Sequence, residues 1–220
     1  MQSSRLTIAE EIILLQLCDE GGAFIHVPNW TNRYAMSGAI LMEFAEAGRI
    51  DTDLKQLTVI NREPLNHQLA DNILDTIESE REIRDIRYWI EYLSDRSDEI
   101  RQDALDGLIG KGILECRDSR ILWVFKSRKY PILDGKQERE VKLRLMEVLF
   151  SDAIPSPRDV ILLCLAHATG ILNVLLPANE LVKLADRVED IRQLDLIGQS
   201  VVNAIRDIEV SLAISTAPLF

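Results

Sequence analysis

The feature that most constrains the fold is a unit that occurs twice: an amphipathic helix that ends on glycine and turns directly into a short β-hairpin. The two copies span residues 37–60 and 101–125. In each copy, apolar residues at helical spacing lead to glycine and a cation, at Gly48-Arg49 and at Gly110-Lys111-Gly112. Glycine adopts the left-handed conformation of a helix cap, and a cation is favourable near the C-terminal end of the helix dipole. Because two β-prone runs follow each time, the repeat predicts a mainly α-helical protein with two small β-hairpins.

Apolar periodicity and cap residues predict the remaining helices. Thr7 and Glu10 have the spacing of a capping box, which predicts a first helix at about residues 8–18 that ends at Gly21 and Gly22. The stretch between this helix and the first repeat is expected to be irregular, since a proline and an asparagine interrupt it. Further helices are expected at about residues 65–80, 83–93, 137–150, 160–168, 179–190 and 194–214. The last is expected to carry an apolar stripe of Leu194, Ile197, Val201, Ile205, Ile208 and Leu212.

Length and composition indicate one soluble, cytoplasmic domain. The chain has 220 residues and no Pro-, Gly- or Ser-rich linker, so the predicted fold is a compact single-domain helical bundle with two small β-hairpins over residues 1–220. Its apolar stretches are much shorter than the ~20 residues of a membrane span, and carboxylates precede any long apolar run at the N-terminus. The three cysteines, Cys18, Cys116 and Cys164, are far apart among apolar neighbours and are interpreted as reduced, buried thiols.

The charge is unevenly distributed along the chain. The formal net charge is -11, which disfavours partners rich in phosphate. Residues 117–144, however, contain nine Lys and Arg against four Asp and Glu, a net charge of +5. We interpret this segment, which includes the second hairpin, as a surface for an anionic membrane, where each cation contributes about 1 kcal/mol. The alternative is a solvated hairpin whose aromatic residues pack inward. The candidate residues are Arg120, Trp123, Phe125, Lys126, Arg128 and Lys129.

No catalytic or metal-binding motif is complete. The nearest match to a nucleophile elbow, at Ser200, lacks the second glycine, and residues 107–112 lack the spacing and the hydroxyl of a P-loop. Cys164 and His167 are three residues apart, but no second pair with ligand spacing accompanies them. We therefore expect no enzyme activity, no cofactor and no metal. Carboxylates are plentiful and are expected as solvating charge on exposed helix faces, among them Glu10, Glu11, Asp103 and Asp106.

Four segments together resemble the Golgi phosphoprotein 3 family. They are LTIAEEIILLQLCDEGG (residues 6–22), SGAILMEFAEAGRI (37–50), GLIGKGIL (107–114) and LCLAHATGILNVLL (163–176). They occur in the family's order and spacing over nearly the whole chain, which is interpreted as a bacterial or otherwise divergent member. The resemblance implies a compact helical fold without catalytic activity. Eukaryotic members bind phosphatidylinositol 4-phosphate on Golgi membranes and bind the cytoplasmic tails of glycosyltransferases. In that family, a hairpin at the position of the second hairpin of this chain serves self-association.

Only some residues of the family's lipid site are present at the corresponding positions of this chain. Family members have two arginines three residues apart on the helix before K-G-I-L; here the second is Arg101 and the first is Asp98. The family's arginine before G-G-I-L is Ser37, and the position of its tryptophan is Pro28. A carboxylate near the phosphate repels it, so the resemblance implies weak or altered lipid selectivity.

Nearby residues can supply the missing groups, because an inositol phosphate needs cationic donors and benefits from bidentate arginine. The candidate headgroup-binding residues are Trp30, Arg33, Arg101 and Arg96. The expected protein is peripheral at a membrane surface and binds a phosphoinositide-like anionic lipid. The alternative is a protein-interaction scaffold with a lapsed lipid site, whose acidic faces bind basic peptide tails. Self-association through the second hairpin is a further expected contact.

The helix–hairpin unit also occurs in winged-helix DNA-binding proteins, which gives a third interpretation. In such proteins the helix before the wing carries several Lys or Arg residues toward the groove. The corresponding helix here has Arg101 and Lys111, but four carboxylates accompany them, at Asp98, Glu99, Asp103 and Asp106. Repulsion of the DNA phosphates is expected to dominate, so nucleic acid is not an expected partner.

Overall fold

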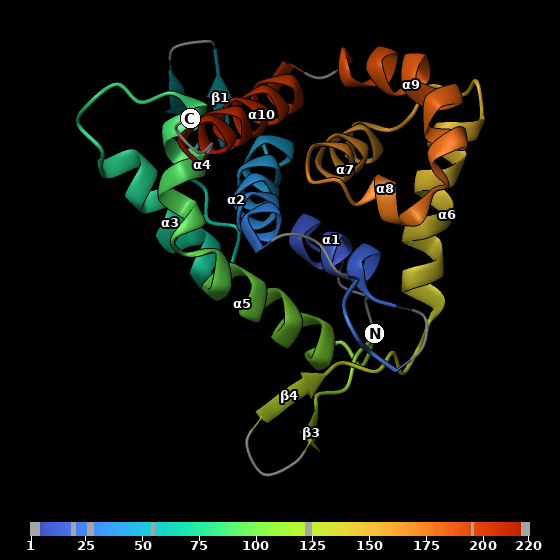
Figure 1. Cartoon of the computed structure of the whole chain (residues 1–220). Coiled ribbons are helices and arrows are strands. Elements are labelled where there is room, and N and C mark those ends of the chain that lie inside the picture. Colours follow the sequence, from blue (N-terminus) through green and yellow to red (C-terminus); the bar gives the residue numbers. More distant parts are fainter. Residues whose placement is uncertain are drawn as a thin grey trace.

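The structure, a computed structural model, describes residues 5–18, 21–25, 29–53, 56–121, 125–194 and 196–216. Within these ranges the chain forms ten helices and two separate two-stranded antiparallel sheets. Helices α1 (Ile8–Gln16), α2 (Asn29–Glu46) and α7 (Pro157–Ala168) lie near the centre, and the other helices surround them (Figure 1). The predicted fold class, a mainly α-helical bundle with two small hairpins, is confirmed.

The first helix begins where its cap residues predict. The Thr7 hydroxyl accepts a hydrogen bond from the backbone N–H of Glu10 at 3.2 Å, and the Glu10 carboxylate accepts one from the N–H of Thr7 at 2.7 Å. This reciprocal pair is the predicted capping box. The helix ends at Gln16, earlier than expected, because the chain turns back at once and forms an antiparallel bridge between Leu17 and Phe24.

The second helix is longer than the sequence indicated. Residues 29–36 were expected to be irregular, but α2 begins at Asn29, so that Trp30 and Arg33 lie on its first turns. These residues include no glycine or proline, and Tyr34 and Met36 are buried in the core. Burial of that apolar side explains why the segment joins the helix that follows it.

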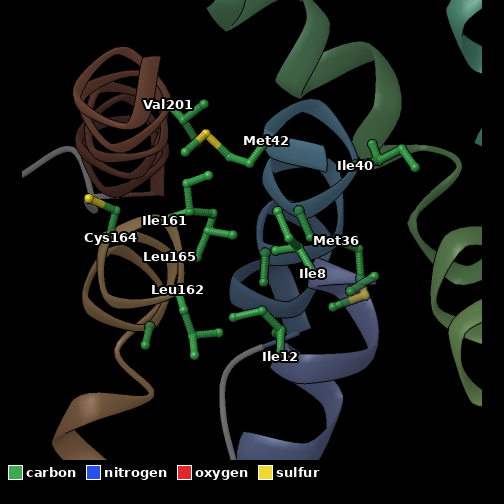
Figure 2. Close-up of a cluster of buried hydrophobic side chains, with 14 of the residues drawn as sticks. Ile8, Ile12, Met36, Ile40, Met42, Ile161, Leu162, Cys164, Leu165 and Val201 are labelled. Atoms are coloured by element: carbon green, nitrogen blue, oxygen red, sulfur yellow. The ribbon is translucent and has the colours of Figure 1, made fainter. Parts of the chain in front are cut away.

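The core forms where the central helices meet α10 (Leu196–Thr216). Every helix contributes buried side chains to it. Figure 2 shows the part formed by these four helices, and it labels Ile8, Ile12, Met36, Ile40, Met42, Ile161, Leu162, Cys164, Leu165 and Val201. The predicted apolar stripe of α10 is confirmed in its middle part, since Val201, Ile205 and Ile208 are buried. Leu194 precedes the helix and is exposed, and the side chain of Leu212 lies outside the described residues.

The outer helices follow the predicted order. They are α3 (Gln68–Ser79), α4 (Ile86–Ser94), α5 (Ser97–Gly110), α6 (Lys136–Phe150), α8 (Leu172–Leu175) and α9 (Ala178–Arg192). Helix α5 begins four residues before the second repeat at residue 101, and, apart from α2 and the unforeseen short α8, each other helix begins within three residues of its expected start. A four-residue helix is too short for a periodic signal, which explains the omission of α8.

Both predicted hairpins are present. Strands β1 (Ile50–Thr52) and β2 (Leu57–Val59) form the first, and β3 (Arg117–Ile121) and β4 (Phe125–Lys129) form the second, which projects from one end of the molecule (Figure 1). The glycine caps before them are confirmed, with positive φ at Gly48 and Gly112.

The three cysteines form no disulfide, as expected, but they are not all buried. Cys164 lies in the core, Cys18 is partly buried and Cys116 is exposed. Cys116 directly precedes β3, where the chain leaves the helical core for the projecting hairpin, and this position explains its exposure.

The carboxylates of α1 correct a second expectation. Glu10 and Glu11 were expected on an exposed face, but each is only 2% exposed. Glu10 accepts a hydrogen bond from Lys111 Nζ at 2.6 Å. Glu11 accepts from Arg144 Nη1 at 2.9 Å and from Arg158 Nε at 3.1 Å. These ion pairs connect α1 to α6, to α7 and to the end of α5.

An unusual histidine contact joins α7 to α10 and makes stability depend on pH. Arg206 Nη2 lies 2.8 Å from His167 Nε2. Burial, together with the cations Arg206 and Arg192, lowers the pKa of His167 to about 4. The imidazole is therefore neutral near pH 7, and its Nε2 accepts a hydrogen bond from the guanidinium.

Stability should therefore fall in mild acid. The unfolded chain protonates His167 near its ordinary pKa of about 6.5, well before the folded chain does, so stability present above that pH is lost as the pH falls toward 4. His167→Gln retains an acceptor without a titrating group and should remove about 1 kcal/mol of the loss between pH 7 and 5. Urea unfolding at several pH values measures this effect. An unchanged pH dependence in the variant would contradict the assignment.

Candidate functional site

The candidate site is a hollow of about 200 Å³ where the first turns of α2 and α5 meet (Figure 1). It is lined by Asn32, Arg33, Met36, Ser97, Asp98 and Arg101. Two of the four predicted headgroup residues, Arg33 and Arg101, are thus brought together from segments far apart in the sequence. The N-terminal turn of α5 opens on the hollow, and the free N–H groups of such a turn favour an anion.

Arg101 is the most distinctive side chain of the hollow. Its guanidinium carbon lies over the ring of Phe24, 4.1 Å from the centroid. Burial lowers the pKa of Arg101, and the charges of Tyr130 and Asp98 only partly oppose this effect. Its Nε is buried without a hydrogen-bond partner. Arg101 is therefore a desolvated cation that lies against an aromatic ring and forms no ion pair with a carboxylate of the described residues.

Arg33 occupies the hollow in a different way, because its charge is already paired. Its Nε donates to the carbonyl of Ser94 at 3.0 Å, and its Nη2 donates to the carboxylate of Asp95 at 2.5 Å. These contacts fix the side chain to the C-terminal end of α4. Arg33 therefore adds positive potential at the rim but has fewer free donors than Arg101.

The other two predicted residues do not line the hollow. Trp30 lies on the first turn of α2, 38% exposed, with its ring 6.5 Å from that of Tyr34. Since it is three positions before Arg33, the exposed indole lies on the same side of the helix. Arg96 is at the N-cap position of α5, and its Nε donates to Glu99 at 2.8 Å.

Four residues of the site were not found from the sequence: Phe24, Asn32, Met36 and Ser97. Phe24 supports Arg101, but it does so only because the loop of residues 21–25 folds against α5. Asn32 has a buried Oδ1 without a hydrogen-bond partner, and Ser97 is the first residue of α5. An aromatic residue shortly after the double glycine was the only available signal, and it was not interpreted as part of a site.

The second hairpin is connected to this site through Phe24. The ring of Phe24 lies 5.7 Å from that of Tyr130, which directly follows β4, and the N–H of Tyr130 donates to the carbonyl of Gly22 at 2.9 Å. Lys129 is exposed at the base of the hairpin. The pairing register places Arg120 opposite Lys126 and Asp118 opposite Arg128, and Phe125 begins β4. Beyond this backbone register, the side chains of these strand residues lie outside the described part, as does the whole of Trp123.

Two negative observations bear on the chemistry. Among the described residues, no group of three or more His, Cys, Asp or Glu side chains is placed to hold a metal ion. None of the helices that the structure describes has the length and apolar composition needed to cross a membrane.

The structure is a mainly helical fold with a small hollow that two arginines and one aspartate line. Residues 8–208 match the family model of Golgi phosphoprotein 3 (GPP34), and the chain belongs to this family. It is similar to vacuolar protein sorting-associated protein 74 of Eremothecium gossypii, with 23% identity over 206 residues, covering 78% of this chain and 61% of the relative. It is also similar to the protein of that name from Schizosaccharomyces pombe, with 28% identity over 203 residues, covering 76% and 59%. The chain thus spans about three fifths of the length of these relatives.

Proposed function

We propose that this protein is a non-catalytic, peripheral membrane protein that binds a phosphate-bearing lipid headgroup in the hollow between α2 and α5. Membership of the Golgi phosphoprotein 3 family supports this function, as does the sorting role that the relatives' name gives them. The observation that carries it is Arg101, a desolvated guanidinium whose Nε has no partner. A phosphate oxygen would supply the missing acceptor and the missing counter-charge.

The surroundings of Arg101 favour an anion but limit its charge. Arg33 and the N-terminal turn of α5 add positive potential, and Trp30 supplies an exposed indole beside the hollow. Such an amphipathic ring is well suited to a membrane–water interface. Asp98 lines the same hollow and opposes a highly charged phosphate. We therefore propose weak or altered selectivity for phosphatidylinositol 4-phosphate and related headgroups.

The second hairpin is proposed as an additional contact with the membrane. It belongs to the segment of net charge +5, and its base is joined to the hollow through Phe24 and Tyr130. Its cations would be attracted to an anionic leaflet, and this attraction should weaken with added salt. The same strands are also the proposed surface for self-association, which sedimentation over a range of protein concentrations would detect.

Loss of the Arg101 guanidinium should weaken membrane binding strongly. Arg101→Ala removes charge-assisted hydrogen bonds worth about 1.5–3 kcal/mol, so affinity should fall roughly 10- to 100-fold. Flotation with vesicles that contain or lack phosphatidylinositol 4-phosphate measures the change. Arg84→Ala is the matched control, because Arg84 also lies over an aromatic ring, 4.3 Å from the centroid of Tyr88, but does not line the hollow. Equal flotation of the wild type and Arg101→Ala would refute the site.

A second candidate function is a scaffold that binds basic peptide tails, and one observation favours it. A hollow of about 420 Å³ is lined by Glu80, Glu82, Tyr88, Trp89 and Tyr92, along with Arg81 and two hydroxyl residues. The Trp89 side chain is buried, and its indole N–H has no acceptor, which a peptide carbonyl would supply. Titration with short Lys- and Arg-rich peptides tests this function. Binding that is absent, or that salt does not weaken, would exclude it.

A further inference from the structure

The hollow contains two opposite charges that are not paired with each other. Asp98 and Arg101 are three positions apart on α5, so they lie on the same side of the helix, and both line the hollow. Neither forms an ion pair with another residue of the described part of the chain. The neighbouring charges differ in this respect, since Arg33 is paired with Asp95 and Arg96 with Glu99. One positive and one negative group therefore remain available to a ligand.

Two buried polar atoms without a hydrogen-bond partner also divide into one donor and one acceptor. The buried Arg101 Nε is a donor without an acceptor, and the buried Asn32 Oδ1 is an acceptor without a donor. A phosphate can satisfy the first group, but it has no hydrogen to offer the second unless it is protonated. An ammonium group can donate both to Asn32 Oδ1 and to the Asp98 carboxylate.

We infer that the hollow selects a zwitterionic phosphate ester, in which an ammonium group lies two carbons from the phosphate, as in a phosphoethanolamine headgroup. This inference rests on the proposed function and names the ligand class of the same site. The phosphate binds Arg101, and the ammonium binds Asp98 and Asn32. The short linker gives the two ligand charges a separation similar to that of side chains three positions apart on a helix, about 5–6 Å between Cβ atoms. Asp98 then attracts the ligand that it would otherwise repel.

The test compares two soluble probes that differ only in the amine, O-phosphoethanolamine and ethyl phosphate. Titrations followed by NMR on the full chain should give an affinity about tenfold higher for O-phosphoethanolamine, because only this probe uses the negative half of the hollow. Asp98→Asn, which keeps the side-chain shape and removes its charge, should reduce this preference to less than about threefold and leave ethyl phosphate bound at least as tightly. Glu99→Gln is the matched control, since Glu99 is adjacent in sequence but does not line the hollow, and it should leave the preference unchanged.

Vesicles distinguish a lipid headgroup from a free phosphate ester. If the ligand is a lipid, phosphatidylcholine vesicles with added phosphatidylethanolamine should bind the wild type more tightly than Asp98→Asn, and binding of the soluble probe alone would indicate a free ester. Equal affinity for the two probes, with Arg101-dependent binding retained, would overturn the inference and leave the proposed function standing. Absence of any Arg101-dependent binding to probes or vesicles would reject both.

Discussion

Replacing Arg158 with alanine should lower the free energy of unfolding by about 3 kcal/mol, because Glu11 and Glu46 each lose one of their two cationic partners. The Arg158 side chain is only 7% exposed, and it pairs with Glu11 through Nε and with Glu46 through Nη1. Its Nη2 also donates to the carbonyl of Leu6. Denaturation by urea, followed by far-UV circular dichroism, measures the loss.

An exposed ion pair supplies the control for this experiment. Arg117 Nε donates to Glu115 at 2.9 Å, but the two side chains are 62% and 43% exposed. Such pairs contribute at most about 1 kcal/mol, and added salt weakens them. A loss for Arg158→Ala no larger than that for Arg117→Ala would show that the buried network around α1 does not stabilise the fold.

The change Gly22→Ala should cost about 2–4 kcal/mol, since it combines backbone strain with a collision. Gly22 has a φ of +67°, and a Cβ built on it would lie 2.2 Å from Pro131 N and 2.3 Å from the carbonyl carbon of Tyr130. The loop would have to move away from the base of the second hairpin. Because Phe24 is in that loop, the support of Arg101 should be lost too. Thermal unfolding and vesicle flotation measure the two consequences.

The variant Gly21→Ala is the control for Gly22→Ala, because it introduces the backbone strain without the steric collision. Gly21 also has a positive φ, +78°, but nothing lies within 4 Å of the position of its Cβ. This variant should cost only about 1 kcal/mol and should retain membrane binding. Equal losses in the two variants would mean that the close approach to the hairpin base is unimportant.

Local signals explain why most of the fold could be predicted. The capping box of Thr7 and Glu10, the glycine caps and the apolar periodicity all act within a few residues of each other, and the helices and hairpins that they predict are present. The burial of Glu11 could not be predicted in this way. Its partners, Arg144 and Arg158, are 133 and 147 positions away, so only the tertiary structure reveals that its charge is compensated.

The candidate site, too, was predictable from the sequence only in part. The resemblance to the family indicated Arg101, and the loop before the first repeat indicated Arg33; the structure places both on one hollow. The contact of Arg101 with Phe24 and the unpartnered Oδ1 of Asn32 depend on how distant segments pack, and no sequence spacing encodes them. The sequence shows the negative charge of Asp98, but whether this charge repels or attracts a ligand depends on the groups that surround it in the folded chain.

The buried carboxylates of α1 have a consequence for biosynthesis. This helix is made early, yet the cations that neutralise it stand at positions 111, 144 and 158. Until the later part of the chain has left the ribosome, two acidic groups cannot enter the interior without a large desolvation cost. Helix α1 can therefore be buried only after Arg158 has been made, and a nascent chain that stops short of residue 158 should remain loosely folded around this helix.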